Sequence, residues 1–209
     1  MGKSERENLF WSRLVEGKDI TFVNELLLLA AQTGNHHFVK SLANLGATNL
    51  NEALVASSAA GERRTVQELL ELNINVHYND DAALREAAAI GGKTLVKMLL
   101  KAGANVNAVE GEALASASAG GHKQVVKVLL KADANVDAGD GEALFQACSN
   151  GHDKVVKVLI KADATVTIRD NAAIKAASEG NHQKIVAMLL KEGATLPVVE
   201  AGGDAADDD

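Results

Sequence analysis

The chain has 209 residues and a formal net charge of −7; 47% of its residues are hydrophobic, but only 3% are aromatic. Ala, Leu and Val must therefore supply nearly all of the core packing, which suits helices better than sheets. The negative charge argues against general nucleic-acid binding, because phosphate contacts need an accumulated basic surface. A single cysteine, Cys148, excludes an intramolecular disulfide framework and favours a reducing compartment.

The sequence shows no membrane or secretion signal. Its longest apolar run, residues 26–31, is too short to cross a bilayer, and the charged start of the chain lacks the apolar stretch of a secretory signal. Arg6 stands where a myristoylation signal needs Ser or Thr. We therefore expect a cytoplasmic protein without membrane insertion, with the nucleus as an open alternative.

The first residues predict a helix that closes one end of the fold. Ser4 and Glu7 have the spacing of a capping box, and apolar residues follow at helical spacing up to Val15. We assign residues 1–23 to an N-terminal capping helix and linker. Its aromatic side chains Phe10 and Trp11 are interpreted as a seal over the core, with an exposed anchor for a partner as the alternative.

From residue 24 to residue 196, one unit of about 30 residues recurs six times. A pair of neighbouring residues, apolar in all units but one, marks the register, and its last five copies are spaced 30 residues apart. The six pairs are Phe38-Val39, Thr65-Val66, Leu95-Val96, Val125-Val126, Val155-Val156 and Ile185-Val186. Such a period predicts a solenoid of units at about 25–51, 52–81, 82–111, 112–141, 142–171 and 172–196. The acidic residues 197–209 show no apolar periodicity and predict a disordered tail.

Each unit reads as two short helices joined by a tight turn. In the fourth unit, Leu114 and Ala117 mark the buried side of the first helix, and Val126 and Leu129 mark that of the second. Both helices end at residues that tolerate a left-handed backbone. After the first helix these are Gly34, Gly61, Gly91, Gly121, Gly151 and Asn181; after the second they are Gly46, Asn73, Gly103, Asp133, Asp163 and Gly193.

Two segments carry a family resemblance. Gly-His-x-x-Val-Val-Lys-Val-Leu-Leu at 121–130 and Lys-Ala-Gly-Ala-Asn-Val-Asn-Ala at 101–108 resemble the ankyrin repeat. The resemblance implies a mainly α fold, an ankyrin-like solenoid of stacked helix-turn-helix repeats with short β-turn or hairpin connections. The Thr-Pro-Leu-His motif of the family is absent, and three residues are missing where the family projects a β-hairpin, so we expect shortened hairpins.

Two charged ladders follow the repeat. Asp80, Glu110, Asp140 and Asp170 each precede a unit by two residues, and we interpret them as helix N-caps or as an acidic edge for a basic partner. The second ladder consists of lysines on the second helices, which predict a solvated convex face, with a polyanion site as the alternative. Its members are Lys40, Lys97, Lys101, Lys127, Lys131, Lys157, Lys161 and Lys191.

The sequence offers no set of catalytic, cofactor-binding or metal-binding residues. His122, His152 and His182 recur once per unit, so we interpret them as structural turn residues rather than ligands of one metal ion. Cys148 replaces a small residue of the other units and is expected to be buried. We therefore expect no enzyme activity, no cofactor and no small-molecule ligand.

The resemblance implies that a partner protein meets the concave face formed by the first helices and the loops before them. The candidate binding residues are Tyr78, Asp80, Arg85, Ile90, Glu110, Asp140, Phe145, Asn150, Arg169, Asp170, Lys175 and Glu179. We expect a protein-binding adaptor whose partner carries a basic patch. The alternatives are a structural subunit of a larger assembly and a polyanion-binding protein that uses the lysine ladder.

Overall fold

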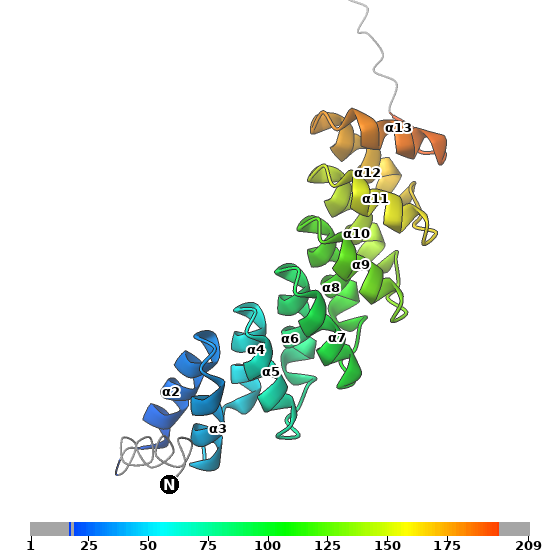
Figure 1. The fold of residues 1–209 in the computed structure, drawn as a ribbon. Helices are drawn as coiled ribbons and strands as arrows, with labels where there is room; N and C mark the ends of the chain where they lie inside the picture. The colour runs from blue at the N-terminus through cyan, green and yellow to red at the C-terminus, as the bar shows by residue number, and fades with distance from the viewer. Residues whose placement is uncertain (1–16, 18, 197–209) are drawn as a thin grey trace, which may run out of the picture.

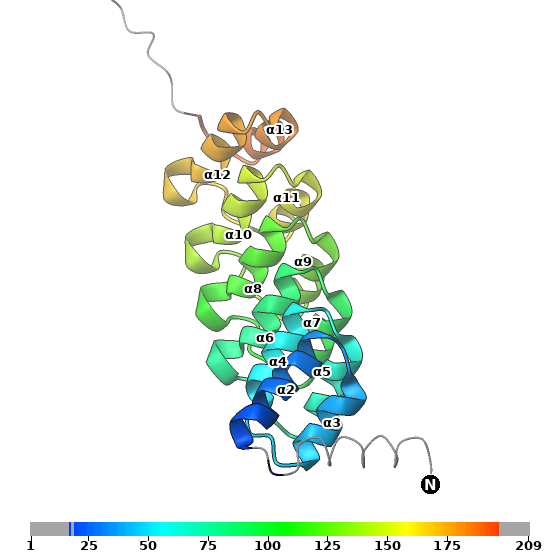
Figure 2. The same cartoon turned by 90° about the vertical axis from the view of Figure 1, so that its left-hand side faces the viewer.

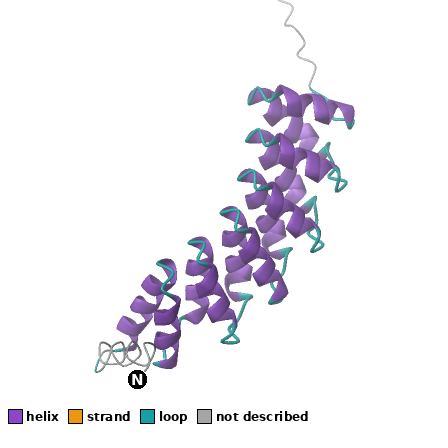
Figure 3. Cartoon of the chain, in the orientation of Figure 1, coloured by secondary structure: helices purple, strands orange, loops and turns teal. Residues whose placement is uncertain are grey.

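The computed structural model describes residues 17 and 19–196 of the chain. This part forms twelve helices, which stack in pairs into an elongated, gently curved solenoid (Figure 1). The described residues contain helices and connecting turns but no strand (Figure 3). Most of the predicted capping helix at 1–23, with its aromatic seal, and all of the predicted tail at 197–209 lie outside the described residues.

The helices divide into two layers, which Figure 2 shows as two columns. The first helices of the pairs are α2 (Ile20–Gln32), α4 (Leu50–Ala59), α6 (Tyr78–Ala89), α8 (Ala108–Ala119), α10 (Ala138–Ser149) and α12 (Ile168–Glu179). The second helices are α3 (His36–Asn44), α5 (Arg63–Leu70), α7 (Lys93–Lys101), α9 (Lys123–Leu130), α11 (Asp153–Ile160) and α13 (Gln183–Lys191). Within each layer a helix packs against those of the neighbouring pairs, as α8 does between α6 and α10.

The core lies between the two layers and runs the length of the stack. Leu114 and Ala117 of α8 and Val126 and Leu129 of α9 are each 1% exposed or less, as the periodicity predicts. Helices of 8 to 13 residues are marginal on their own in water, so their stability depends on this packing between neighbours. The predicted register is therefore confirmed by the burial of its key positions.

The chain reverses at residues with left-handed backbone, as predicted. All twelve predicted positions have φ between +52° and +98°. At the end of α8 the reversal residue is Gly121, and after α9 it is Asp133. These residue types enter the left-handed region at low cost. Their local backbone preferences therefore determine where each of the two helices in a repeat ends.

The recurring histidines connect successive repeats. His152 Nε2 donates a hydrogen bond to the carbonyl oxygen of Ala119 at 2.8 Å, and the equivalent bonds of His122 and His182 to the preceding repeats measure 2.9 and 3.1 Å. The imidazole of His152 also covers Gly121, where a Cβ atom would lie only 2.7 Å from Nδ1. The interpretation as structural residues is confirmed, and the glycine is required for space as well as for its φ.

A second set of bonds, which the sequence analysis did not foresee, joins the repeats at their other edge. Asp81 Oδ1 accepts a hydrogen bond from the backbone N–H of Asn105 at 2.9 Å. One unit later the same position is Gly111, and Asn107 instead accepts from the N–H of Asn135 at 2.8 Å. The first arrangement recurs at Asn24, Asn51 and Asn171, and the second recurs at Asp137. The bond between repeats is thus retained with its backbone donor at one repeat position, although the position of the acceptor side chain changes.

Four of the first helices contain a backbone feature that the sequence does not predict. Three consecutive residues with φ between +48° and +77° lie near the start of α6, α8, α10 and α12, at 79–81, 109–111, 139–141 and 169–171. We call them the left-handed stretches. They occupy the place of the expected shortened hairpins. Gly111 suits this backbone, whereas Val109, with φ +48°, is β-branched and therefore strained.

Ser118 provides a test of the packing inside the first-helix layer. Its hydroxyl is fully buried and has no hydrogen-bond partner among the described residues, and the equivalent residue of the preceding unit is Ala88. Because an unsatisfied buried hydroxyl is unfavourable, we expect Ser118→Ala to raise the free energy of unfolding by about 1 kcal/mol in urea titrations. Ser57 is the control, since its buried hydroxyl donates to the Leu54 carbonyl and its replacement should bring no gain. Equal gains at both serines would contradict the assignment.

Candidate functional site

The acidic ladder lies in the left-handed stretches. Asp80, Glu110, Asp140 and Asp170 each occupy the middle position of a stretch and are exposed. The interpretation of the ladder as helix N-caps is wrong, because a capping residue precedes its helix in non-left-handed, typically extended backbone. Among the described residues, the carboxylates of Asp80, Glu110 and Asp140 accept no hydrogen bond from a helix N-terminus and have no ion-pair partner. Three acidic side chains are therefore presented to solvent at equivalent places in successive repeats.

Asp170 differs from the other three because it has a partner. Lys175 Nζ lies 2.6 Å from its Oδ2. This hydrogen bond and the lysine charge lower the pKa of Asp170 below its ordinary value. The acidic ladder thus has three free positions and a fourth that is neutralised by its own helix.

Glutamates at one position of the first helices join neighbouring repeats on the same face. Arg85 Nη1 donates to Oε2 of Glu112 at 2.7 Å, and the Tyr78 hydroxyl donates to Oε1 of Glu52 at 2.8 Å. The bond to Glu52 is the largest cause that raises the pKa of Tyr78 above its ordinary value. Two of the predicted binding residues are therefore held in place by acids of the adjacent repeat.

Phe145 and Arg169 form the third such contact. Arg169 Nη1 donates to Oε2 of Glu142 at 2.7 Å, its Nη2 donates to the Gly139 carbonyl at 2.6 Å, and its guanidinium carbon lies 5.9 Å from the Phe145 ring centroid. Partial burial raises the pKa of Glu142, but hydrogen bonds from Gln146 and Arg169 outweigh it and hold the pKa below its ordinary value. The half-buried ring of Phe145 therefore lies beside a fixed cation.

The remaining predicted residues lie toward the ends of the first helices. Ile90 follows α6 and is 44% exposed, Asn150 follows α10 and donates to the Gln146 carbonyl at 2.9 Å, and Glu179 is the exposed last residue of α12. All twelve predicted binding residues thus lie on first helices, in their left-handed stretches or directly after them. Val109, which is 49% exposed beside Glu110, lies on the same face. No pattern in the sequence predicts the strained backbone of Val109.

The side chains able to take part in catalytic or metal chemistry include one thiol and several carboxylates and imidazoles among the described residues. Cys148 is buried, as expected, and burial raises the pKa of its thiol to about 12, so it stays protonated near neutral pH. Within residues 19–196, no three His, Cys, Asp or Glu side chains gather in a way that would hold a metal ion. No helix in this part of the chain is long and apolar enough to cross a membrane.

The fold defines the class of protein: a helical solenoid in which each repeat contacts its neighbours and leaves long faces open. The family model for ankyrin repeats (3 copies) matches residues 27–110, 84–170 and 114–200. The chain belongs to the ankyrin-repeat family. No curated protein matches it in a sequence comparison. Ankyrin repeats are protein–protein interaction modules and typically have no catalytic activity of their own.

Proposed function

We propose that the chain is a non-catalytic adaptor that binds a partner protein through the concave face built by its first helices and left-handed stretches. The observation that carries the proposal is the row of exposed carboxylates at Asp80, Glu110 and Asp140, which have no ion-pair partner among the described residues. Their equal placement in successive repeats fits a partner that carries a basic patch.

The backbone beneath these carboxylates supports the same function. Consecutive left-handed residues are costly for side chains other than Gly, Asn and Asp, yet Val109, Glu110 and Arg169 adopt this conformation. Backbone strain of this kind concentrates at binding sites, where the surrounding structure holds it in place. The exposed side chain of Val109 adds an apolar contact next to the charge of Glu110.

Tyr78 and Phe145 are the proposed aromatic anchors of this face. Each is half-buried and lies close to a residue of an adjacent repeat, Tyr78 through its bond to Glu52 and Phe145 beside the guanidinium of Arg169. A ring that is already immobilised loses little conformational entropy on binding, so such residues often contribute strongly to an interface. The acidic side chains would then steer the partner, and the rings would supply contact area.

Proximity labelling with the full chain tests this function. We expect the Tyr78→Ala, Phe145→Ala double variant to lose the principal partners of the wild type, and the Asp80→Asn, Glu110→Gln, Asp140→Asn variant to lose those that carry basic patches. Arg64→Gln, on the exposed side of α5 in the other layer, is the control and should keep them. Thermal melts must first show that each variant is folded. Identical partner sets for all folded variants would refute the choice of face.

A further inference from the structure

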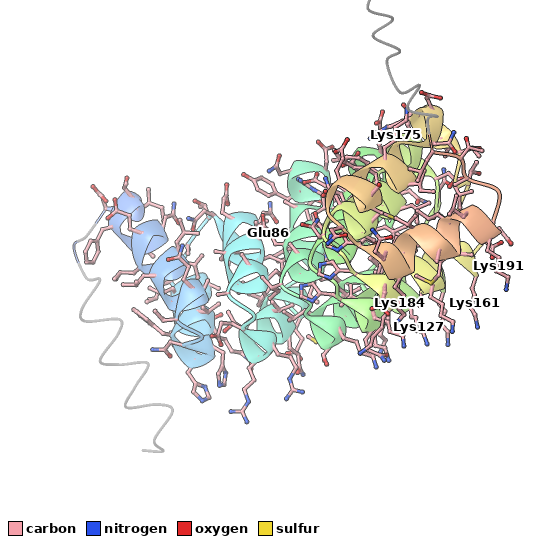
Figure 4. The ribbon with its side chains drawn as sticks, turned by 90° about the horizontal axis from the view of Figure 1, so that it is seen from above. Glu86, Lys127, Lys161, Lys175, Lys184 and Lys191 are labelled. Atoms are coloured by element: carbon pink, nitrogen blue, oxygen red, sulfur yellow. The ribbon has the colours of Figure 1, made fainter. Side chains whose placement is uncertain are left out.

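The second-helix layer carries a large set of lysines on its outer side, and among the described residues only Lys184 of the set has an ion-pair partner. Figure 4 shows Lys127, Lys161, Lys184 and Lys191 along one side of the stack, with Lys175 on the opposite side. We call the following set the lysine face: Lys93, Lys97, Lys101, Lys123, Lys127, Lys131, Lys154, Lys157, Lys161, Lys184 and Lys191.

The lysine face is hollowed between α9, α11 and α13. A groove of about 410 Å³ lies there, and we call it the lysine groove. Its lining consists of Lys123, Lys127, Asp153, Lys154, Lys157, Val158, Lys161, Lys184 and Met188. A second hollow of about 510 Å³ toward α7 shares Lys127, Val158 and Lys161 with it. The two together form a trough that crosses several repeats.

The charges of the lysine groove are poorly compensated within the chain. Its one acid, Asp153, is paired with Lys184, which lowers the pKa of Asp153 below its ordinary value. Among the described residues, Lys127, Lys157 and Lys161 have no carboxylate within ion-pair distance. Lys161 directly follows α11 and is four residues from Lys157, a spacing at which like charges repel.

The basic side chains of the first-helix layer differ from the lysine face in their ion pairing. Arg85, Arg169 and Lys175 are the basic residues of its described helices, and each is paired with a carboxylate. The chain therefore neutralises positive charge on one layer and accumulates it on the other, although its net charge is −7. The positive charge is therefore a local property of the second-helix layer, which could attract a negatively charged partner despite the net charge of the chain.

The lining of the groove favours a peptide over a nucleic acid. Val158 and Met188 provide apolar contacts between the lysine side chains, and the lining contains neither an aromatic ring nor an arginine. Single-stranded nucleic acids are bound largely by stacking on aromatic rings, and arginine is the residue best suited to bidentate phosphate contacts. An amphipathic peptide offers both carboxylates for the lysines and apolar side chains for the floor.

We propose that the lysine groove binds an acidic, amphipathic segment of a second protein. Apolar side chains of the segment pack against Val158 and Met188, and its carboxylates pair with Lys127, Lys157 and Lys161. The groove lies on the layer opposite to the first-helix face, so both faces are open at once. The chain then bridges a basic partner and an acidic one.

Fluorescence anisotropy with the full chain and defined probes tests the groove. The probes are a labelled helical peptide with Leu on one face and Glu on the other, the same peptide with every Glu replaced by Gln, a single-stranded DNA oligonucleotide and vesicles that contain phosphatidylserine. We expect only the acidic peptide to bind well, with an affinity that falls as salt rises.

Substitutions in the lysine groove test whether the peptide binds there. Lys127→Gln, Lys157→Gln, Lys161→Gln should weaken binding of the acidic peptide by about tenfold, because three charge pairs are lost. Val158→Ser should weaken peptide binding by a smaller factor, because it removes an apolar contact at the floor of the groove. Arg64→Gln lies outside the groove and should leave peptide binding unchanged. Thermal melts check that each variant is folded.

Three outcomes would overturn the proposal. Peptide binding that is insensitive to the triple lysine variant would place the site elsewhere. Equal binding of DNA or vesicles, with no effect of Val158→Ser, would indicate a general polyanion surface. Binding that appears only after Asp207, Asp208 and Asp209 are replaced by Asn would identify the acidic C-terminal segment of this chain as the occupant.

Discussion

Replacing Leu129 by alanine should lower the free energy of unfolding by about 2–5 kcal/mol. Leu129 is fully buried in α9, near the middle of the stack, where helices of the neighbouring pairs pack on both sides. The substitution removes buried apolar surface and leaves a cavity that the flanking repeats cannot readily collapse, because they pack against their own neighbours as well. In a solenoid the loss also weakens the contact between adjacent repeats, which holds short helices together.

Urea titration followed by circular dichroism measures this effect. Leu190→Ala is the matched control, because Leu190 lies on α13 at the end of the described repeats and is 49% exposed. It should cost well under half as much as Leu129→Ala, since most of its surface already contacts solvent. An unfolding midpoint that Leu129→Ala leaves unchanged would refute the predicted register of the repeats.

Replacing Gly121 by alanine should cost about 2–3 kcal/mol, from two separate causes. Its φ of +69° is unfavourable for any residue with a Cβ, and that atom would stand 2.7 Å from Nδ1 of His152. The imidazole has to move, which breaks its bond to the Ala119 carbonyl. Gly121→Ala thus disturbs both the turn within one repeat and the contact with the next.

Gly103 separates the two causes. Its φ is +98°, but a Cβ atom there would meet nothing within 4 Å, so Gly103→Ala should cost only the backbone term of about 1–2 kcal/mol. In a His152→Ala background the clash is absent, and Gly121→Ala should then cost about as much as Gly103→Ala. This double-mutant cycle isolates the histidine contact. If Gly121→Ala and Gly103→Ala lowered the free energy of unfolding by similar amounts in the wild-type background, the contact between His152 and Gly121 would not contribute to stability.

The two proposed interfaces rest on the arrangement of charge along the stack. Acids at the left-handed stretches are exposed and unpaired at Asp80, Glu110 and Asp140, whereas the free lysines gather on the opposite layer. Because exposed charges more than about 10 Å apart are screened at physiological salt, each face acts locally on its own partner. A chain that is acidic overall can therefore still present a basic surface.

The histidine and aspartate contacts show where sequence reasoning stops. The positions of His122, His152 and His182 predict a recurring structural role, but not that each imidazole covers a glycine of the preceding repeat. The acidic ladder was likewise visible as a pattern, whereas its placement in left-handed backbone was not. Val109 and Arg169 adopt that backbone against their own preference, so only the packing of the repeats can impose it.

The helices, their buried sides and the twelve left-handed reversals follow from the amino-acid sequence alone, because these features depend on residues within one or two turns of each other. Periodicity shows which side of a helix is apolar, and Gly, Asn or Asp marks where the chain can reverse. The pairing of charges, in contrast, depends on how the repeats stack. The partners of Arg85 and Arg169 lie 27 residues away, and the free lysines of α9 and α11 meet across a groove that exists only when the repeats stack.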